Sequence, residues 1–342
     1  MIRFSKGLVL VICSSLLSCC VVVDQEPVVT TLTVIATNDV HGELDSVRGG
    51  LSSYSGYVDI LRALRSDDGD VLLLDAGDMW QGTLESNINE GAAVMSVFNE
   101  LRYDAATIGN HEFDFGPVGE RFIPEEPDDD PQGALKQRAS EARFPILAAN
   151  LIDTKTGSPI AWDNVKPSVL IEKQGIKIGI IGVTTMETLT STIGVNTAGL
   201  TMAPLAPTIE REARALRSKG AQLLIVLAHA GGECTDFSDP HDLSSCNLQD
   251  EVFEVANALP VGSVDQIIGG HNHKGIAHVV NGIAVTTAYR SAIAFSRVDF
   301  QIDRTSGTIL ARRIFPPERV CGVVDGTQAC VSADYRTARS PA

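Results

Sequence analysis

The chain is poor in basic residues and, after its first twenty residues, in long hydrophobic runs. It has 27 Lys and Arg against 43 Asp and Glu among 342 residues, which gives a formal net charge of −16 at pH 7. Proteins that bind nucleic-acid duplexes normally have the opposite balance, because they neutralise phosphates with Lys and Arg. The composition therefore argues against duplex binding. No segment after residue 20 is long and apolar enough to predict a membrane span.

The first twenty residues, MIRFSKGLVLVICSSLLSCC, have the pattern of a secretory signal. Two basic residues precede an apolar stretch over 7–17, which is too short to span a bilayer, and small residues follow it. The ending LLSC is similar to a bacterial lipobox, which predicts that Cys19 becomes the lipidated first residue of the mature chain. An ordinary cleaved signal is the alternative. We expect residues 1–19 to be a signal, 20–30 a tether, and the protein to be exported to the bacterial periplasm or cell envelope with a lipid anchor.

The cysteines lack the C-x₂-C spacing of zinc modules. Cys234 and Cys246 flank one polar loop, and Cys321 and Cys330 flank another. Because disulfides form and persist in exported proteins, each pair is predicted to close a local loop. A cysteine-rich metal site is the alternative.

Apolar runs alternate with segments of helical periodicity through most of the chain. TLTVIATND (31–39) and DVLLLDAGD (70–78) are typical of strands, and the segment between them has apolar residues at helical spacing. The acidic stretch PEEPDDDPQG (124–133) is expected to be an exposed loop. Residues 276–315 are predicted to be all β, with a tight turn at Asn281–Gly282. Strand–helix units joined to hairpins predict an α/β sandwich with mixed sheets.

Polar side chains follow five of the predicted strands at the point where each strand ends. The motifs are ATNDVHGEL, DAGDMWQG, IGNHEFDFG, LAHAGG and IGGHNHKG, and they contain five of the seven histidines. Because open α/β sheets bind ligands at the carboxyl ends of their strands, these motifs can converge on one site. Asp, Asn and His at this density are typical ligands of a pair of Zn, Mn or Fe ions.

Residues two apart on a strand point to the same side of a sheet. Asp39 and His41 are therefore expected to face the same way, and so are His271 and His273. This alternation would let each pair contribute both of its side chains to the site.

The five motifs resemble, in the correct order, the signatures of the calcineurin-like metallophosphoesterases. NDVHG, DAGDMWQGT, GNHEFDFG, LAHAGG and GGHNHK carry the resemblance, and TTMET (184–188) matches the 5′-nucleotidase branch. The resemblance covers about 31–315 and implies a four-layer αββα sandwich of two mixed β-sheets flanked by helices. It implies a catalytic domain over 31–320 and a tail over 321–342. We expect the C-terminal substrate domain of full-length 5′-nucleotidases to be absent.

The resemblance also implies a site with two divalent ions, for which Zn, Mn, Fe and Co are all candidates. It implies seven ligands, of which three hold one ion, three hold the other and one bridges both. The ligands of the first ion are Asp39, His41 and His273, those of the second are Asn110, His229 and His271, and the bridging residue is Asp78. His111 would be the catalytic histidine, and Asp114 would orient it.

The implied activity is metal-dependent hydrolysis of phosphomonoesters, with nucleotides as the expected substrates. In-line attack would come from a hydroxide that bridges the two ions, with His111 as acid or transition-state stabiliser. The expected partner is a small-molecule phosphoester. Hydrolysis of a phosphodiester, a nucleotide-sugar or a sulfur ester is an alternative, and a non-catalytic metal-binding surface lipoprotein is another. His111 and Asp114, which metal binding does not need, argue against the last alternative.

Other residues of these motifs are expected to support the structure. Asp75 would cap the end of a strand, and Glu112 would have a structural role. Trp80 could either stack on a ligand or pack in the core. Arg48 and Arg290 are candidate phosphate contacts, although ordinary surface positions are the favoured interpretation.

Overall fold

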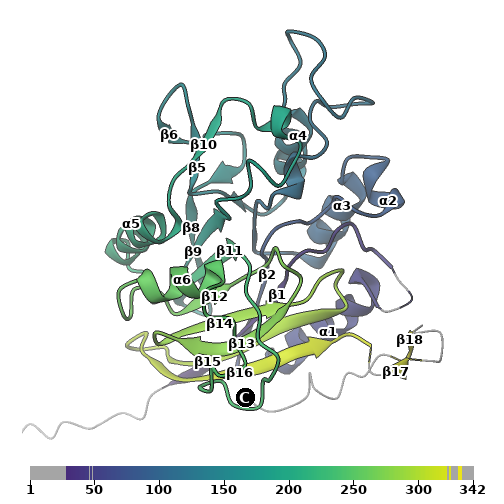
Figure 1. Cartoon of the computed structure of the whole chain (residues 1–342). Helices are drawn as coiled ribbons and strands as arrows, with labels where there is room; N and C mark the ends of the chain where they lie inside the picture. Colours follow the sequence, from purple (N-terminus) through teal and green to yellow (C-terminus); the bar gives the residue numbers. More distant parts are fainter. Residues whose placement is uncertain (1–27, 46, 48, 322, 325–329, 333–342) are drawn as a thin grey trace, which may run out of the picture.

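Two β-sheets packed face to face form the centre of the molecule (Figure 1). The computed structural model describes residues 28–321 apart from 46 and 48, together with 323–324 and 330–332. In sheet order, the first sheet consists of β16 (Ile309–Arg319), β15 (Ala294–Asp303), β1 (Val29–Thr37), β2 (Gly69–Asp75), β3 (Ala105–Thr107), β4 (Ile146–Leu147) and β7 (Val165–Lys166). The second sheet consists of β13 (Gly275–Val280), β14 (Ile283–Ala288), β12 (Gln266–Ile268), β11 (Leu223–His229), β9 (Ile176–Thr184) and β8 (Ser168–Lys173).

Both sheets are mixed. In the first sheet, β1, β2, β3, β4 and β7 are parallel, and β15 pairs antiparallel with both β1 and β16. In the second sheet, β9, β11, β12 and β14 are parallel, and the edge strands β8 and β13 are antiparallel to their neighbours. The carboxyl ends of the parallel strands therefore lie at one edge of each sheet.

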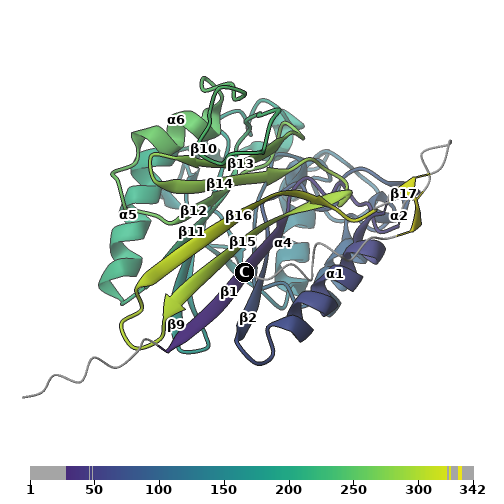
Figure 2. The ribbon, with the colours of Figure 1, turned by 90° about the horizontal axis from the view of Figure 1, so that it is seen from below.

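Helices cover the outer face of each sheet. The first sheet is covered by α1 (Leu51–Leu64), α3 (Ala92–Leu101) and α4 (Gly133–Glu141), and the second by α5 (Leu205–Ser218) and α6 (Glu251–Ala258). Figure 2 shows the layers, with α5 and α6 on one side of the sheets and α1 on the other. The four-layer αββα sandwich expected from the sequence is confirmed.

Neighbouring residues of each strand belong to different core layers, because successive side chains of a strand point to opposite faces. In β1, Val34 packs between the sheets, whereas Ile35 packs under the helices of the first sheet. In β9, Ile180 lies between the sheets and Ile181 under the helices of the second sheet. All four are buried, so each sheet contributes apolar side chains on both faces.

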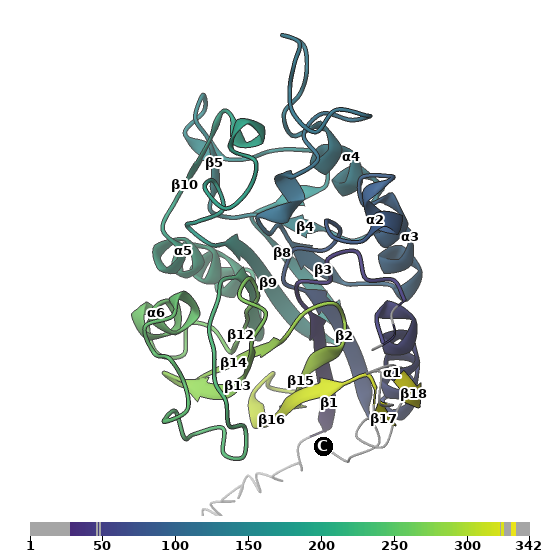
Figure 3. The ribbon, with the colours of Figure 1, turned by 45° about the vertical axis from the view of Figure 1, so that its right-hand side comes forward.

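Shorter elements complete the described part of the chain. These are α2 (Leu84–Asn87), the 3₁₀ turns η1 (His111–Phe113) and η2 (Gly194–Thr197), a small sheet of β10 (Leu200–Met202), β5 (Leu151–Asp153) and β6 (Ser158–Pro159), and the pair β17 (Val323–Val324) and β18 (Cys330–Ser332). Figure 3 shows the small sheet and α4 at the opposite end of the molecule from β15 and β16. Residues 124–132 form a loop that is exposed over 125–128, as expected, but the helix α4, which begins at Gly133, is not evident from the sequence pattern.

Cys234 and Cys246 form a disulfide with an Sγ–Sγ distance of 2.04 Å. His278 has a ring nitrogen near the two sulfurs, but sulfurs bonded to each other are not available as thiolate metal ligands. Cys321 is also disulfide-bonded. The side chain of Cys330 lies outside the described residues, so its pairing stays a prediction, as does the lipidation of Cys19, which also lies outside them.

Within the part of the chain that the structure describes, no helix combines the length and apolar character needed to cross a membrane.

A close contact between the two sheets depends on Gly182 of β9. A Cβ atom at this position would lie 2.3 Å from Cβ of Leu147 and 2.8 Å from Oγ1 of Thr107, both of which belong to the first sheet. We expect Gly182→Ala to lower the free energy of unfolding by about 1–3 kcal/mol, because the extra methyl group overpacks the contact. Denaturant unfolding measures the change.

Gly194→Ala is the matched control, since a Cβ at Gly194 would meet no atom within 4 Å. Equal stability of the two glycine variants would contradict this account of the interface.

Candidate metal centre

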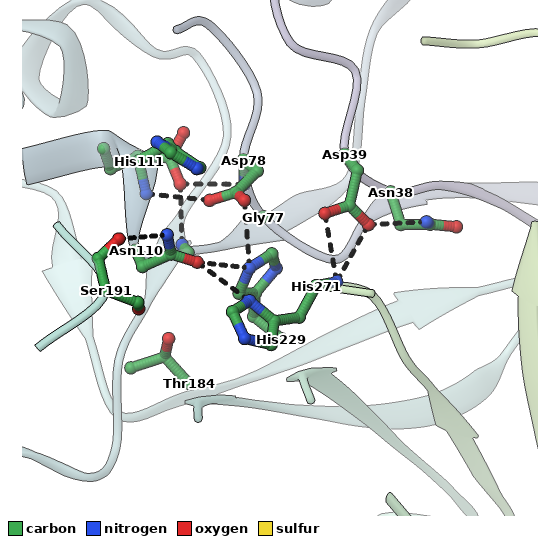
Figure 4. Close-up of polar contacts among 12 residues, drawn as sticks. Asn38, Asp39, Gly77, Asp78, Asn110, His111, Thr184, Ser191, His229 and His271 are labelled. Atoms are coloured by element: carbon green, nitrogen blue, oxygen red, sulfur yellow. Dashed lines mark hydrogen bonds and ion pairs between the residues drawn. The ribbon is translucent and has the colours of Figure 1, made fainter. Parts of the chain in front are cut away.

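The seven residues predicted to bind metal lie together where five strands end. They are Asp39 and His41 after β1, Asp78 after β2, Asn110 after β3, His229 at the end of β11, and His271 and His273 after β12. Figure 4 shows side chains from both sheets meeting at this place. Two groups of candidate ligand atoms form there, each with its atoms within 4.8 Å of one another: Asp39, His41 and His273 in the first group, and Asp78, His229 and His271 in the second.

The backbone at the two Asp/His and His/His pairs is not extended, so the strand alternation that the sequence suggested is not the reason why these side chains converge. β1 ends at Thr37 and β12 at Ile268, so the alternation of a strand does not explain why the paired residues converge. Five of the seven residues instead have left-handed backbone with φ between 49° and 77°, namely Asp39, His41, Asp78, His271 and His273. Non-glycine residues seldom adopt this conformation, and such outliers cluster at functional sites.

In the second group, three candidate ligand atoms face one another. Nδ1 of His229 donates its N–H to the carbonyl oxygen of Ala76 (2.8 Å), so Nε2 is the ring nitrogen that faces the site. This Nε2 lies 3.1 Å from Oδ2 of Asp78 and 3.1 Å from Oδ1 of Asn110. The Asn110 amide donates to the carbonyl of Ser191 (3.0 Å), which fixes Oδ1 toward the site. One nitrogen and two oxygens arranged in this way fit a cation, which would displace the proton of Nε2 on binding.

His271 completes the second group, with Nδ1 3.0 Å from Oδ1 of Asn110. Its backbone N–H donates to both carboxylate oxygens of Asp39, at 3.0 and 2.9 Å, and Asn38 donates to Oδ2 of Asp39 at 2.7 Å. The two groups are therefore joined through the chain as well as through space. Asn38 belongs to the first motif, but the sequence gave no role for it and no sign of this backbone contact.

The first group has the same character. Nδ1 of His41 bonds to the carbonyl of Gln81 (2.8 Å), and its Nε2 lies 3.0 Å from Nε2 of His273. Nε2 of His273 lies 3.5 Å from Oδ1 of Asp39. Oδ2 of Asp78 lies 3.9 Å from Nε2 of His41, and it also faces His229, so this one carboxylate faces both groups. The donor set of nitrogen and oxygen atoms fits two divalent cations of the Zn, Mn, Fe or Co class.

The electrostatics of the pocket favour positive charge. Burial lowers the pKa of His229, but the adjacent Asp78 carboxylate raises it to about 10. Burial would raise the pKa of Asp78, yet His229 and His41 hold it below its usual range. Burial lowers the pKa values of His41 and His271, which disfavours a proton on these rings. A metal cation can satisfy all of these groups at once, whereas a proton satisfies only one pair.

His111 and Asp114 form an ion pair beside the two groups. Nδ1 of His111 lies 2.5 Å from Oδ2 of Asp114, and the backbone N–H of His111 donates to Oδ1 of Asp78 at 2.9 Å. The hydrogen bond to Asp114 is the main reason that the pKa of His111 rises to about 9. The ring is 33% exposed and lies 5.3 Å from the ring of His41, between centroids. His111 is thus a cationic, accessible group next to the predicted ligands.

The supporting residues of the motifs have identifiable contacts. The buried carboxylate of Glu112 accepts the backbone N–H groups of Gly109, Asp78 and Met79 at 2.6–2.8 Å, so it shapes the turn that carries Asp78. Burial raises the pKa of Glu112. Asp75 accepts the N–H of Gly77 (2.8 Å) in the manner of a strand-end cap.

The remaining candidates are Trp80, Arg290 and Arg48. Trp80 is fully buried in the core under the helices of the first sheet, so its side chain packs and cannot stack on a ligand. Arg290 is exposed, in agreement with a surface position. Arg48 lies outside the described residues.

Comparisons with known proteins agree with this geometry. The family model described as calcineurin-like phosphoesterase matches residues 32–275, which include all seven predicted ligands. A 5′-nucleotidase of Diplobatis ommata is 30% identical over 250 residues, covering 71% of this chain and 37% of that protein. Protein UshA of Yersinia enterocolitica is 27% identical over 338 residues, covering 91% of this chain and 56% of that protein.

The fold also has relatives among solved structures. The 5′-nucleotidase precursor from Thermus thermophilus superposes with a TM-score of 0.61 at 23% identity, covering 84% of this chain and 54% of that one. At this identity the likeness concerns the fold. The chain spans about half the length of the curated relatives it matches.

Replacing one ligand from each group tests the assignment of the site. We expect His229→Ala and His273→Ala each to lose about one bound ion per chain, because each leaves one group a ligand short. Mass spectrometry of the metal content of the purified, reloaded protein measures this. His241→Ala is the matched control, since His241 is exposed and lies outside both groups. Full metal content in both site variants would exclude these residues as ligands.

Proposed function

The chain belongs to the calcineurin-like phosphoesterase family, and on that premise we propose that it is a metal-dependent phosphohydrolase that cleaves phosphomonoesters, with nucleotides as the substrate class. The observation that supports this proposal most directly is the position of Asp78, which faces two groups of metal-ligand atoms while also bonding to the backbone of His111. The printed names of the relatives as 5′-nucleotidases support nucleotides as substrates.

Residues on this chain would hold each ion. His229, His271 and Asn110 would hold one, His41, His273 and Asp39 the other, and Asp78 would bridge the two. When bound, a pair of divalent cations lowers the pKa of a shared water and neutralises charge on a phosphoryl group.

The pair of His111 and Asp114 would supply a proton donor to the reaction. With a pKa of about 9, the His111 ring is protonated on both nitrogens at pH 7. Oδ2 of Asp114 accepts a hydrogen bond from Nδ1–H, which leaves the N–H of Nε2 free to bond to a phosphoryl or leaving-group oxygen. Such a group can stabilise developing negative charge or protonate the departing oxygen. A surface protein that only bound metal would not need the pair of His111 and Asp114.

The location and partners of the protein are further parts of the proposal. The signal-like residues 1–19 support export to the periplasm or cell envelope, with Cys19 as the anchored residue. The deficit of Lys and Arg supports a small-molecule partner rather than a nucleic-acid duplex.

A turnover screen of the purified chain, stripped of metal and reloaded, tests the proposal. It would compare nucleoside monophosphates with a cyclic nucleotide, a nucleotide-sugar, a sulfur ester and a generic aryl phosphate. We expect metal-dependent release of phosphate, fastest from nucleoside monophosphates. Preferred cleavage of another ester class would replace the substrate assignment, and no turnover of any of them would reject the enzyme.

The variant His111→Ala tests whether His111 acts as a general acid or as a metal ligand. We expect turnover to fall by about 10²–10⁴-fold, the range for a positioned general acid, while metal content stays that of the unmodified protein. Steady-state kinetics and metal analysis on the same sample measure both. If metal content falls together with turnover, His111 is a ligand or a scaffold residue and its proposed role is wrong.

A further inference from the structure

A loop from the second sheet contacts the segment that carries His111. This loop, which we call the β9 loop, comprises residues 185–193 between β9 and η2. The carbonyl of Ser191 accepts the side-chain amide of Asn110 (3.0 Å), and Figure 4 shows these two residues side by side. Oγ1 of Thr192 donates to Oδ1 of Asp114 at 2.7 Å. Neither Ser191 nor Thr192 belongs to a motif that pointed to the site.

The β9 loop is anchored at both ends. At its start, the N–H of Thr185 donates to the carbonyl of His229 (2.8 Å), and the hydroxyls of Thr184 and Thr188 bond to each other at 2.7 Å. Just after it, the buried side chain of Asn196 donates to the carbonyl of Phe113 in η1 at 2.8 Å. The chain on either side of Thr192 is therefore held by contacts that do not involve Asp114.

The two oxygens of Asp114 have different partners. Oδ1 accepts the hydroxyl of Thr192, and Oδ2 accepts Nδ1–H of His111. A carboxylate can rotate about its Cβ–Cγ bond, and torsions of this type are soft. Because Thr192 holds one oxygen, the other is kept directed at the imidazole, and the imidazole is kept directed at the site.

We propose that Thr192 is a further positioning residue of the enzyme: it holds Asp114 in the rotamer that aligns His111 for the reaction. It acts through Asp114 and does not itself touch substrate or metal. The contribution of Thr192 to turnover rests on the proposed function, whereas its effect on the contact between His111 and Asp114 does not. Residues that orient a catalytic group through a hydrogen bond commonly affect the rate, because a small displacement of that group slows the reaction.

Thr192→Val removes the hydroxyl and keeps the size and branching of the side chain. We expect kcat to fall about tenfold, a typical effect of losing a hydrogen bond to a charged group, with KM and metal content unchanged. Thr192→Ser keeps the hydroxyl and should restore kcat to about half of the original value or more. Thr190→Val is the matched control, because the Thr190 hydroxyl bonds to the carbonyl of Glu187 within the loop (2.9 Å) and its loss should leave kcat unchanged.

A double-mutant cycle tests whether Thr192 acts through Asp114. Residues that act as one unit show strongly non-additive effects. We expect Thr192→Val combined with Asp114→Ala to be as slow as Asp114→Ala alone. If the two losses instead multiply, Thr192 acts by another route and the proposal is overturned.

A spectroscopic measurement on the full chain does not depend on any substrate. Proton NMR with nitrogen-labelled histidine can detect the hydrogen-bonded Nδ1–H of His111, identified by its absence in His111→Ala. We expect this resonance to persist in Thr192→Ser and Thr190→Val and to shift or broaden away in Thr192→Val. A resonance that Thr192→Val leaves unchanged, or that the unmodified protein lacks, overturns the proposal. Because no turnover is needed, this result is distinguishable from a failure of the proposed function.

Discussion

Asp78 is a fully buried carboxylate with imidazole nitrogens on two sides, and the rest of the site follows from this placement. One of its oxygens faces His229 at 3.1 Å and His41 at 3.9 Å, while the other accepts the backbone N–H of His111 at 2.9 Å. A buried carboxylate is costly unless positive charge or donors compensate it. Two cations between Asp78 and the imidazoles would supply that charge, and the same residue would then fix the position of His111 relative to both.

The local structure that holds Asp78 in place lowers the stability of the fold. Its backbone is left-handed, and a Cβ on Gly109 would lie 2.2 Å from its Oδ1. The turn around it uses a second buried carboxylate, Glu112, to accept three backbone N–H groups. Strained backbone and buried acids lower stability unless the surrounding structure over-determines them. Here the large double-layered core provides that surrounding structure.

Local signals in the sequence predicted a sandwich of mixed sheets and the convergence of the five motifs, whereas the four layers and the individual ligands came from the family resemblance. Buried strands are continuous apolar runs, and histidines are few enough that five in strand-end motifs stand out. Other features depend on tertiary contacts and leave no such signal. The apolar face of α4 is small, with Leu135 as its largest buried aliphatic side chain. Thr192 lies in the threonine- and serine-rich segment TLTST, where no spacing distinguishes it, and only the fold brings it to Asp114.

Each group of predicted ligands is assembled from both sheets, which links the packing of the sandwich to the chemistry. Asp39 and His41 follow a strand of the first sheet and meet His273 from the second, while Asn110 from the first meets His229 and His271 from the second. The distances between the ligands therefore depend on how the two sheets pack together. The contact of Gly182 with Leu147 and Thr107 is part of that packing. The β9 loop crosses the same boundary when it bonds to Asn110 and Asp114. A shift of one sheet along the other would therefore separate the ligands of both ions and misalign His111 in a single movement.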